Sequence, residues 1–114
     1  MSERKYSDFV QDIIDAIISI NKFLKGVTFE EFSSDDKTSS AVTRKFEIIG
    51  EAANRIPKKI QDNYPQIPWN YMIGMRNKII HDYDGVNLMI VYDSAKEDLN
   101  DLLNLLNEII EQIY

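Results

Sequence analysis

The chain has 114 residues, 44% of them hydrophobic and 28% charged, so it can bury one hydrophobic core and intrinsic disorder is not expected. It contains no cysteine, which excludes a disulfide framework, a thiolate metal site and a cysteine nucleophile, and fits a reducing compartment. The net charge of −6 has the wrong sign for a protein that binds nucleic acid over a broad basic surface, so any contact with nucleic acid must be local.

The charged residues at the N-terminus are not followed by an apolar stretch of the kind that a signal peptide has. The sequence also contains no run of about 18 uncharged apolar residues. We therefore expect neither secretion nor insertion into a membrane, and the cytoplasm is the expected location. The length predicts a single domain over residues 1–114.

Helical periodicity runs through almost the whole chain, and no segment alternates with the period of two that is typical of a half-buried strand. A first helix is predicted over about residues 7–24, with Lys25-Gly26 as a basic last turn and a glycine stop. The polar, serine-rich residues 27–40 indicate a connection, in which residues 29–32 can form one helical turn. A second helix is predicted over about residues 37–56, where a proline follows.

A third helix is predicted over about residues 68–82. Pro68 suits its first position, because the N–H that proline lacks would have no partner there. After the turn signal Asp84-Gly85, one long helix is predicted over about residues 87–114, as the longest of the four. With no internal repeat, these segments predict an all-α, up-and-down four-helix bundle.

On a helical wheel at about 100° per residue, the third helix carries an arginine where a core residue is expected. Arg76 lies at the centre of the apolar stripe, and the residues within about 60° of it are Trp69, Met72, Ile73, Ile79, Ile80 and Tyr83. A buried charge is costly unless it is paired and hydrogen-bonded. Arg76 therefore either pairs with an acid of the last helix, for example Asp93 or Glu97, or reaches past the stripe into a cleft.

A polar stripe lies beside the apolar one and consists of Asn70, Gly74, Asn77 and His81. A glycine inside a helix costs about 1 kcal/mol relative to alanine, which suggests that another backbone or a ligand comes close to Gly74. Arg76 and His81 diverge by about 140° on a straight helix. Arg76 could curl round, the helix could loosen near its end, or two copies could meet about a two-fold axis. We favour the homodimer, with this stripe as its contact face.

Glu47 and Glu51 lie four residues apart on one face of the second helix, where paired carboxylates can bind a metal or act in acid–base chemistry. Arg44 and Arg55 flank them at helical spacing. A solvated face of salt bridges is therefore the favoured interpretation, and no metal site is predicted.

The segment from Arg76 to Tyr83 matches a known signature, in which an arginine and a polar residue are followed by three further positions, a histidine, any residue and a tyrosine. This is the signature of HEPN domains, and the chain resembles their HepT-like toxin branch. The resemblance also rests on Ile49-Gly50-Glu51-Ala52, on Ile67-Pro68-Trp69 and on the leucine-rich last segment. It thus covers nearly the whole chain.

The resemblance implies a dimer of helical bundles with both signatures in one cleft, and a metal-independent endoribonuclease that needs no cofactor and cuts single-stranded RNA. His81 would be the general acid/base and Arg76 would stabilise the charge of the transition state. Asn77 would orient the histidine or the phosphate, and Lys78 and Tyr83 would support RNA binding.

The resemblance further implies a toxin–antitoxin pair, in which a nucleotidyltransferase antitoxin silences the toxin by transferring AMP to Tyr83. The alternative is a non-catalytic module that binds nucleotide or RNA, or that serves as the substrate of a nucleotidyltransferase. The structural alternative for His81 is a favourable charge at the end of a helix, and Tyr83 can have a core role as well as a modification role.

Overall fold

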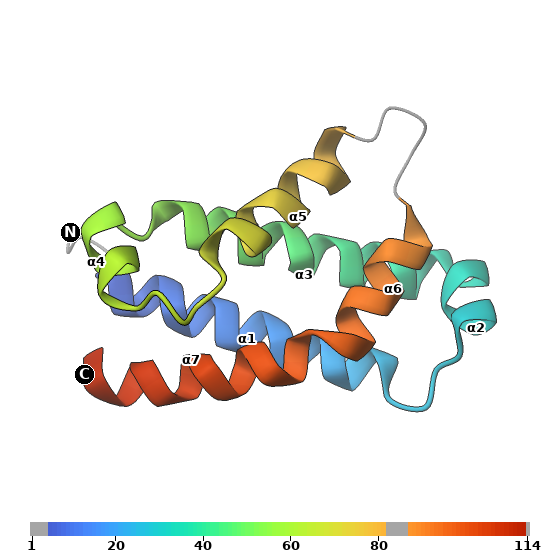
Figure 1. The fold of residues 1–114 in the computed structure, drawn as a ribbon. Helices are drawn as coiled ribbons and strands as arrows, with labels where there is room; N and C mark the ends of the chain where they lie inside the picture. The colour runs from blue at the N-terminus through green and yellow to red at the C-terminus, as the bar shows by residue number, and fades with distance from the viewer. Residues whose placement is uncertain (1–4, 82–86, 114) are drawn as a thin grey trace.

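A computed structural model describes residues 5–81 and 87–113, with the side chains of residues 80 and 81 outside the description (Figure 1). Every regular element in these ranges is an α-helix, which confirms the predicted all-α class. The helices are α1 (Tyr6–Leu24), α2 (Phe29–Ser34), α3 (Asp36–Arg55), α4 (Lys58–Asn63), α5 (Trp69–His81), α6 (Leu88–Glu97) and α7 (Leu99–Ile113).

The first helices begin and end at residues with clear local causes. Helix α2 starts with a capping box, in which the Thr28 side chain accepts a hydrogen bond from the Glu31 N–H and the Glu31 carboxylate accepts one from the Thr28 N–H. Asp35 caps α3 by accepting from the N–H of Thr38. Helix α1 ends as predicted, because Gly26 adopts a φ of +71°, which costs a glycine little.

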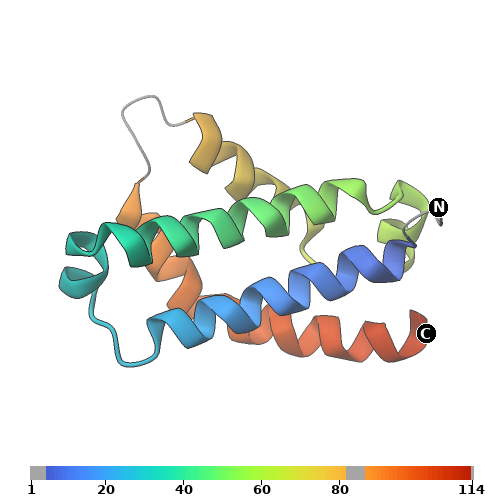
Figure 2. The same ribbon diagram turned by 180° about the vertical axis from the view of Figure 1, so that it is seen from behind.

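Three long helices form the body of the bundle. Helix α3 packs on α1 along one side and on α5 along the other, and α1 also packs on α7. Figures 1 and 2 show α1, α3 and α7 running lengthwise, whereas α5 runs at an angle to α3 and its last turn lies outside this layer. The side chains that are almost completely buried between these helices are Val10, Ile13, Ile17 and Ile20 of α1, Phe46 and Ile49 of α3, Met72 of α5, and Leu99, Leu106 and Ile109 of α7.

The prediction of one unbroken helix over residues 87–114 is wrong. The chain bends at Asp98, between α6 and α7, so that α3, with 20 residues, is the longest of the described helices. The hydroxyl of Tyr71 donates a hydrogen bond of 2.7 Å to the Asp98 carboxylate at this bend. Apolar residues keep helical spacing through the junction, which is why the pattern alone does not reveal it.

Contacts of α6 explain why it departs from the direction of α7. The Tyr92 hydroxyl donates a hydrogen bond of 2.6 Å to the carbonyl of Val27, and the Lys96 ammonium donates one of 2.8 Å to the carbonyl of Leu24. Helix α6 is thus held against the end of α1 and the connection that follows it.

The short helix α4 was not predicted, since only one of its six residues is apolar. It links the end of α3 to the start of α5. The Gln61 amide donates to the carbonyls of Ala53 and Ile56, both at 3.1 Å, and the Trp69 indole donates to the carbonyls of Gln61 and Tyr64, also at 3.1 Å. These bonds fix where α5 begins.

Helix α5 begins at Trp69, so the predicted start at Pro68 was one residue early. Pro68 lies just before the helix, and its carbonyl accepts a hydrogen bond of 3.2 Å from the Met72 N–H. Within the described ranges no helix is both long and apolar enough to cross a membrane.

Candidate functional site

Arg76 lies on the face of α5 that turns toward α3, among buried apolar side chains. Met72 and Ile79, one turn before and one turn after it, are 1% and 6% exposed. Arg76 itself is partly buried. The structure therefore places this arginine within the apolar stripe, as the helical wheel predicts.

The stem of Arg76 lies directly against Gly50 of α3. A Cβ atom built on Gly50 would lie 2.1 Å from the Cβ of Arg76 and 3.0 Å from its Cγ and Cδ. Such distances are shorter than atoms in contact allow, so the two helices can approach this closely only because residue 50 has no side chain.

The guanidinium of Arg76 has little of the pairing that a buried charge requires. Its Nε is buried and has no hydrogen-bond partner in the described part of the chain, and its Nη1 donates to the Asn77 Oδ1 at the long distance of 3.4 Å. Asp93 and Glu97 are exposed, and of the residues that the structure describes none forms an ion pair with Arg76. The predicted alternative of a structural pair with either acid is therefore wrong.

The polar stripe of α5 is open surface within one chain. Asn70, Gly74 and Asn77 are exposed, as is Lys78 beside them. A Cβ built on Gly74 would meet no described atom within 4 Å, so the close approach predicted there does not come from the described part of this chain. His81 is the last residue of α5, and its side chain, like the whole of Tyr83, lies outside the described residues.

The carboxylates of α3 form the predicted face of salt bridges. The Nη1 atom of Arg44 lies 3.1 Å from Glu47 Oε2 and 3.5 Å from Glu51 Oε1, and the Arg44 side chain is 58% exposed. Arg55 is exposed. Over residues 5–81 and 87–113, no group of three histidine, cysteine or acidic side chains is placed so that it could hold a metal ion.

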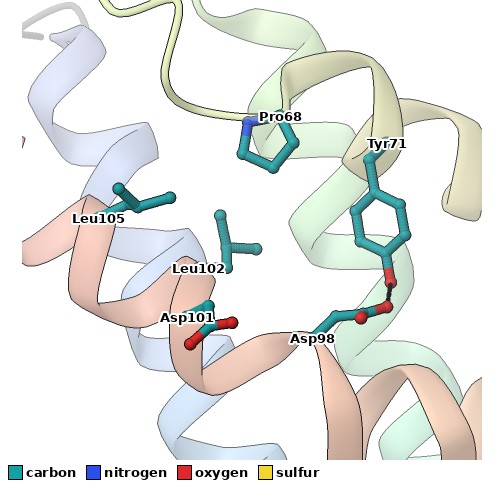
Figure 3. Close-up of a pocket in the computed structure, with 6 residues that line it drawn as sticks. All are labelled: Pro68, Tyr71, Asp98, Asp101, Leu102 and Leu105. Carbon is teal, nitrogen blue, oxygen red and sulfur yellow. Dashed lines mark hydrogen bonds between the residues drawn. The ribbon is translucent and has the colours of Figure 1, made fainter.

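A pocket of about 320 Å³ lies between the start of α5 and α7 (Figure 3). Its lining residues are Pro68, Tyr71, Asp98, Asp101, Leu102 and Leu105. Burial raises the pKa of Tyr71 to about 12, so its hydroxyl is a neutral donor to Asp98 at physiological pH. Sequence reasoning missed this contact because Tyr71 falls outside both stripes of α5, and Arg76 is not part of the pocket.

Sequence reasoning also missed the role of Gly50, which entered only as one residue of the resemblance. A glycine between an isoleucine and a glutamate in a long helix is the signal that could have indicated a close helix crossing. Arg76, Asn77 and Lys78 are brought together on α5, whereas their relation to the side chains of His81 and Tyr83 lies outside the described residues.

The fold and this arrangement define an all-α bundle in which one helix carries a poorly paired arginine beside exposed polar residues. Comparison with known families identifies it further: the chain belongs to the ribonuclease HepT-like family, whose model matches residues 13–109. No solved structure matches the chain.

Two archaeal relatives are similar over nearly their full lengths. A protein of Thermococcus cleftensis named "Probable ribonuclease HepT" is 42% identical over 100 residues, which cover 88% of this chain and 91% of the relative. A protein of Methanocaldococcus jannaschii named "Putative RNase MJ1216" is 37% identical over 113 residues, which cover 99% of this chain and 93% of the relative. The predicted membership of the HepT-like family is thereby confirmed.

Proposed function

We propose that this protein is a metal-independent endoribonuclease that cuts single-stranded RNA at a site formed by Arg76, Asn77 and His81. The family supports a ribonuclease, since the matched model and the relatives are named as ribonucleases. The observation that carries the assignment of Arg76 is that its stem lies against α3 while its guanidinium has no acidic partner among the described residues. A guanidinium with no internal counter-charge is available to a phosphate.

The reaction follows from the chemistry of these side chains. The His81 imidazole accepts the proton of a ribose 2′-hydroxyl, and the 2′-oxygen attacks the adjacent phosphorus as the bond to the 5′-oxygen breaks. The leaving 5′-oxygen takes up a proton, which gives a 2′,3′-cyclic phosphate and a 5′-hydroxyl end. Arg76 donates hydrogen bonds to the phosphate oxygens as negative charge develops on them, and the Asn77 amide orients the phosphate or the imidazole.

We further propose that two copies form one site. Arg76 and His81 diverge by about 140° on a helix, and each chain has a single histidine, so a second copy would supply the second proton-transfer group. The exposed stripe of Asn70, Gly74 and Asn77 is the contact face that this arrangement uses, with Lys78 adding positive charge for RNA. A monomeric mass by light scattering at micromolar concentration would contradict the dimer.

Cleavage of single-stranded RNA in the presence of EDTA tests the nuclease. The wild type should cut, whereas Arg76→Ala and His81→Ala should cut at least about 100-fold more slowly. Lys58→Ala is the matched control, because Lys58 is an exposed cation paired with Asp62 on α4. If wild type, Arg76→Ala and His81→Ala cut equally, or if none of them cuts, the nuclease assignment fails and a non-catalytic module that binds RNA or nucleotide takes its place.

Regulation is proposed to act through Tyr83 within a toxin–antitoxin pair. A nucleotidyltransferase antitoxin would transfer AMP from ATP to the Tyr83 oxygen with release of pyrophosphate, which adds bulk and negative charge seven residues from Arg76. Intact-mass measurement after co-expression with such an enzyme should show AMP additions to the wild type and none to Tyr83→Phe. An unmodified wild type, or equal modification of both, would contradict the proposal.

A further inference from the structure

The crossing of α3 and α5 leaves no room for a side chain at residue 50. A Cβ atom there would lie 2.1 Å from the Cβ of Arg76, whereas ordinary contact begins at 3.4 Å. The Cβ of Arg76 is fixed to the backbone of α5 and cannot rotate away. Any side chain at position 50 would therefore move α5 relative to α3 by more than 1 Å at the level of Arg76, the difference between these two distances.

The contact with Gly50 also directs the guanidinium of Arg76. The Cγ and Cδ of Arg76 both lie 3.0 Å from the position that a Cβ of residue 50 would take, so the stem runs across the surface that the glycine leaves bare. Beyond the stem, Nε is buried and has no partner among the described residues, and Nη1 lies 3.4 Å from Asn77 Oδ1. The stem thus faces α3 while Nη1 reaches the exposed polar stripe.

This arrangement does not serve the stability of the core. A buried donor without a partner is unfavourable, and an apolar side chain at position 76 would fill the stripe without it. A glycine within α3 is also less favourable for the helix than alanine. Gly50 and Arg76 are therefore consistent with a shared function, in which the glycine lets the arginine stem occupy a fixed place.

We propose that Gly50 is a positioning residue of the ribonuclease site: it acts through Arg76, by letting the arginine stem lie against α3 so that the guanidinium faces the RNA phosphate from a fixed position. The proposal rests on the proposed function, because it assigns Arg76 to the transition state. A misplacement of a catalytic group by about 1 Å can reduce the reaction rate by about 100-fold. Gly50 therefore affects the rate through the position of Arg76, without contacting RNA.

A measurement on the wild-type protein tests the positioning without any substitution. By NMR, the Nε–H group of Arg76 should be rigid and exchange slowly with water, whereas that of Arg55, which is exposed on α3, should be mobile and exchange fast. Equal mobility and exchange at both arginines would overturn the proposal.

The substitution Gly50→Ala tests the effect on the reaction. The variant should remain helical by circular dichroism, and its kcat should fall by at least about tenfold. Asn54→Ala, an exposed position one turn further along α3, is the matched control and should keep the wild-type kcat. Wild-type activity in folded Gly50→Ala would overturn the proposal, and if this variant does not fold the NMR comparison decides.

A double-mutant cycle separates positioning from a general loss of structure. If Gly50 acts through Arg76, then Arg76→Ala should reduce kcat by about 100-fold in the wild type but by less than about tenfold in Gly50→Ala. Losses that simply multiply would show that Gly50 acts independently of Arg76. If wild-type protein does not cut RNA at all, the proposed function fails, whereas a rigid Nε–H signal still shows that the Arg76 side chain is held in place.

Discussion

Helices α7 and α5 both turn an apolar stripe toward the core, but they fill it differently. The stripe of α7 is uninterrupted, with Leu99, Leu102, Leu106 and Ile109 buried at helical spacing. The stripe of α5 is interrupted by Arg76, whose Nε is buried without a partner in the described chain. Helix α7 thus follows the pattern that burial alone would select.

The difference between α5 and α7 shows where the chain carries residues that burial and helix formation alone would not select. Three features of the α3–α5 pair are unfavourable on their own: a glycine inside each helix, at positions 50 and 74, and the buried Nε of Arg76, which has no partner in the part of the chain that the structure describes. Such departures gather at functional sites. The comparison assigns stability mainly to α1, α3 and α7, and it supports the proposal that α5 carries the functional site.

Leu106→Ala should have the largest effect on stability, because Leu106 is fully buried. The substitution should lower the free energy of unfolding by about 2–5 kcal/mol, as truncation of a core leucine leaves a cavity. Urea denaturation followed by circular dichroism measures it. A loss below about 1 kcal/mol would show that α7 is not part of the main core.

Trp69→Phe should have the second-largest effect on stability. It removes the indole donor that bonds the carbonyls of Gln61 and Tyr64, and it leaves space at a buried position, for an expected loss of about 1–3 kcal/mol. Circular dichroism is the suitable probe, because Trp69 is the only tryptophan. An unchanged unfolding free energy would contradict the anchoring of α5 through α4.

Gly74→Ala should have a smaller effect of the opposite sign. Because no described atom lies within 4 Å of the added methyl position, the variant should gain about 1 kcal/mol at concentrations where the protein is monomeric. The gain should shrink or reverse at concentrations where the proposed dimer forms. A loss of stability in the monomer would show that the open stripe is covered within the chain.

Tyr71→Phe should have the smallest effect, a loss of about 0.5–1 kcal/mol from the partly exposed hydrogen bond to Asp98. The pKa of Tyr71 is raised to about 12, so its contribution is complete below pH 10 and is lost as the pH rises through 12. The difference in unfolding free energy between wild type and Tyr71→Phe should therefore vanish between pH 10 and pH 12. A difference that is constant over this range would contradict the role of the hydroxyl.

The sequence could predict the helices wherever the apolar spacing is regular and the ends carry a recognisable signal, as at Gly26. It could not predict the bend at Asp98, because α6 is held by hydrogen bonds from Tyr92 and Lys96 to carbonyls 65 and 72 residues away. Nor could it predict helix α4, whose position depends on bonds from Gln61 to carbonyls at the end of α3.

The candidate site likewise has one feature that the sequence could predict and one that it could not. The helical wheel identifies Arg76 as an anomaly from the spacing of its own helix, because that spacing is a local property. It cannot show that Gly50 of another helix explains the anomaly, since the contact depends on how α3 and α5 cross. The roles of His81 and Tyr83 stay predictions.

The most direct test of the account is the rate of RNA cleavage by Arg76→Ala in EDTA, measured on protein whose unfolding free energy has been determined. The account predicts a rate at least about 100-fold below that of the wild type from a variant that remains folded, because the substitution removes packing against Gly50 but also a buried nitrogen that has no partner among the described residues. A variant that cuts RNA at the wild-type rate, or that loses activity only because it unfolds, would contradict the claim that Arg76 serves the reaction and not the core.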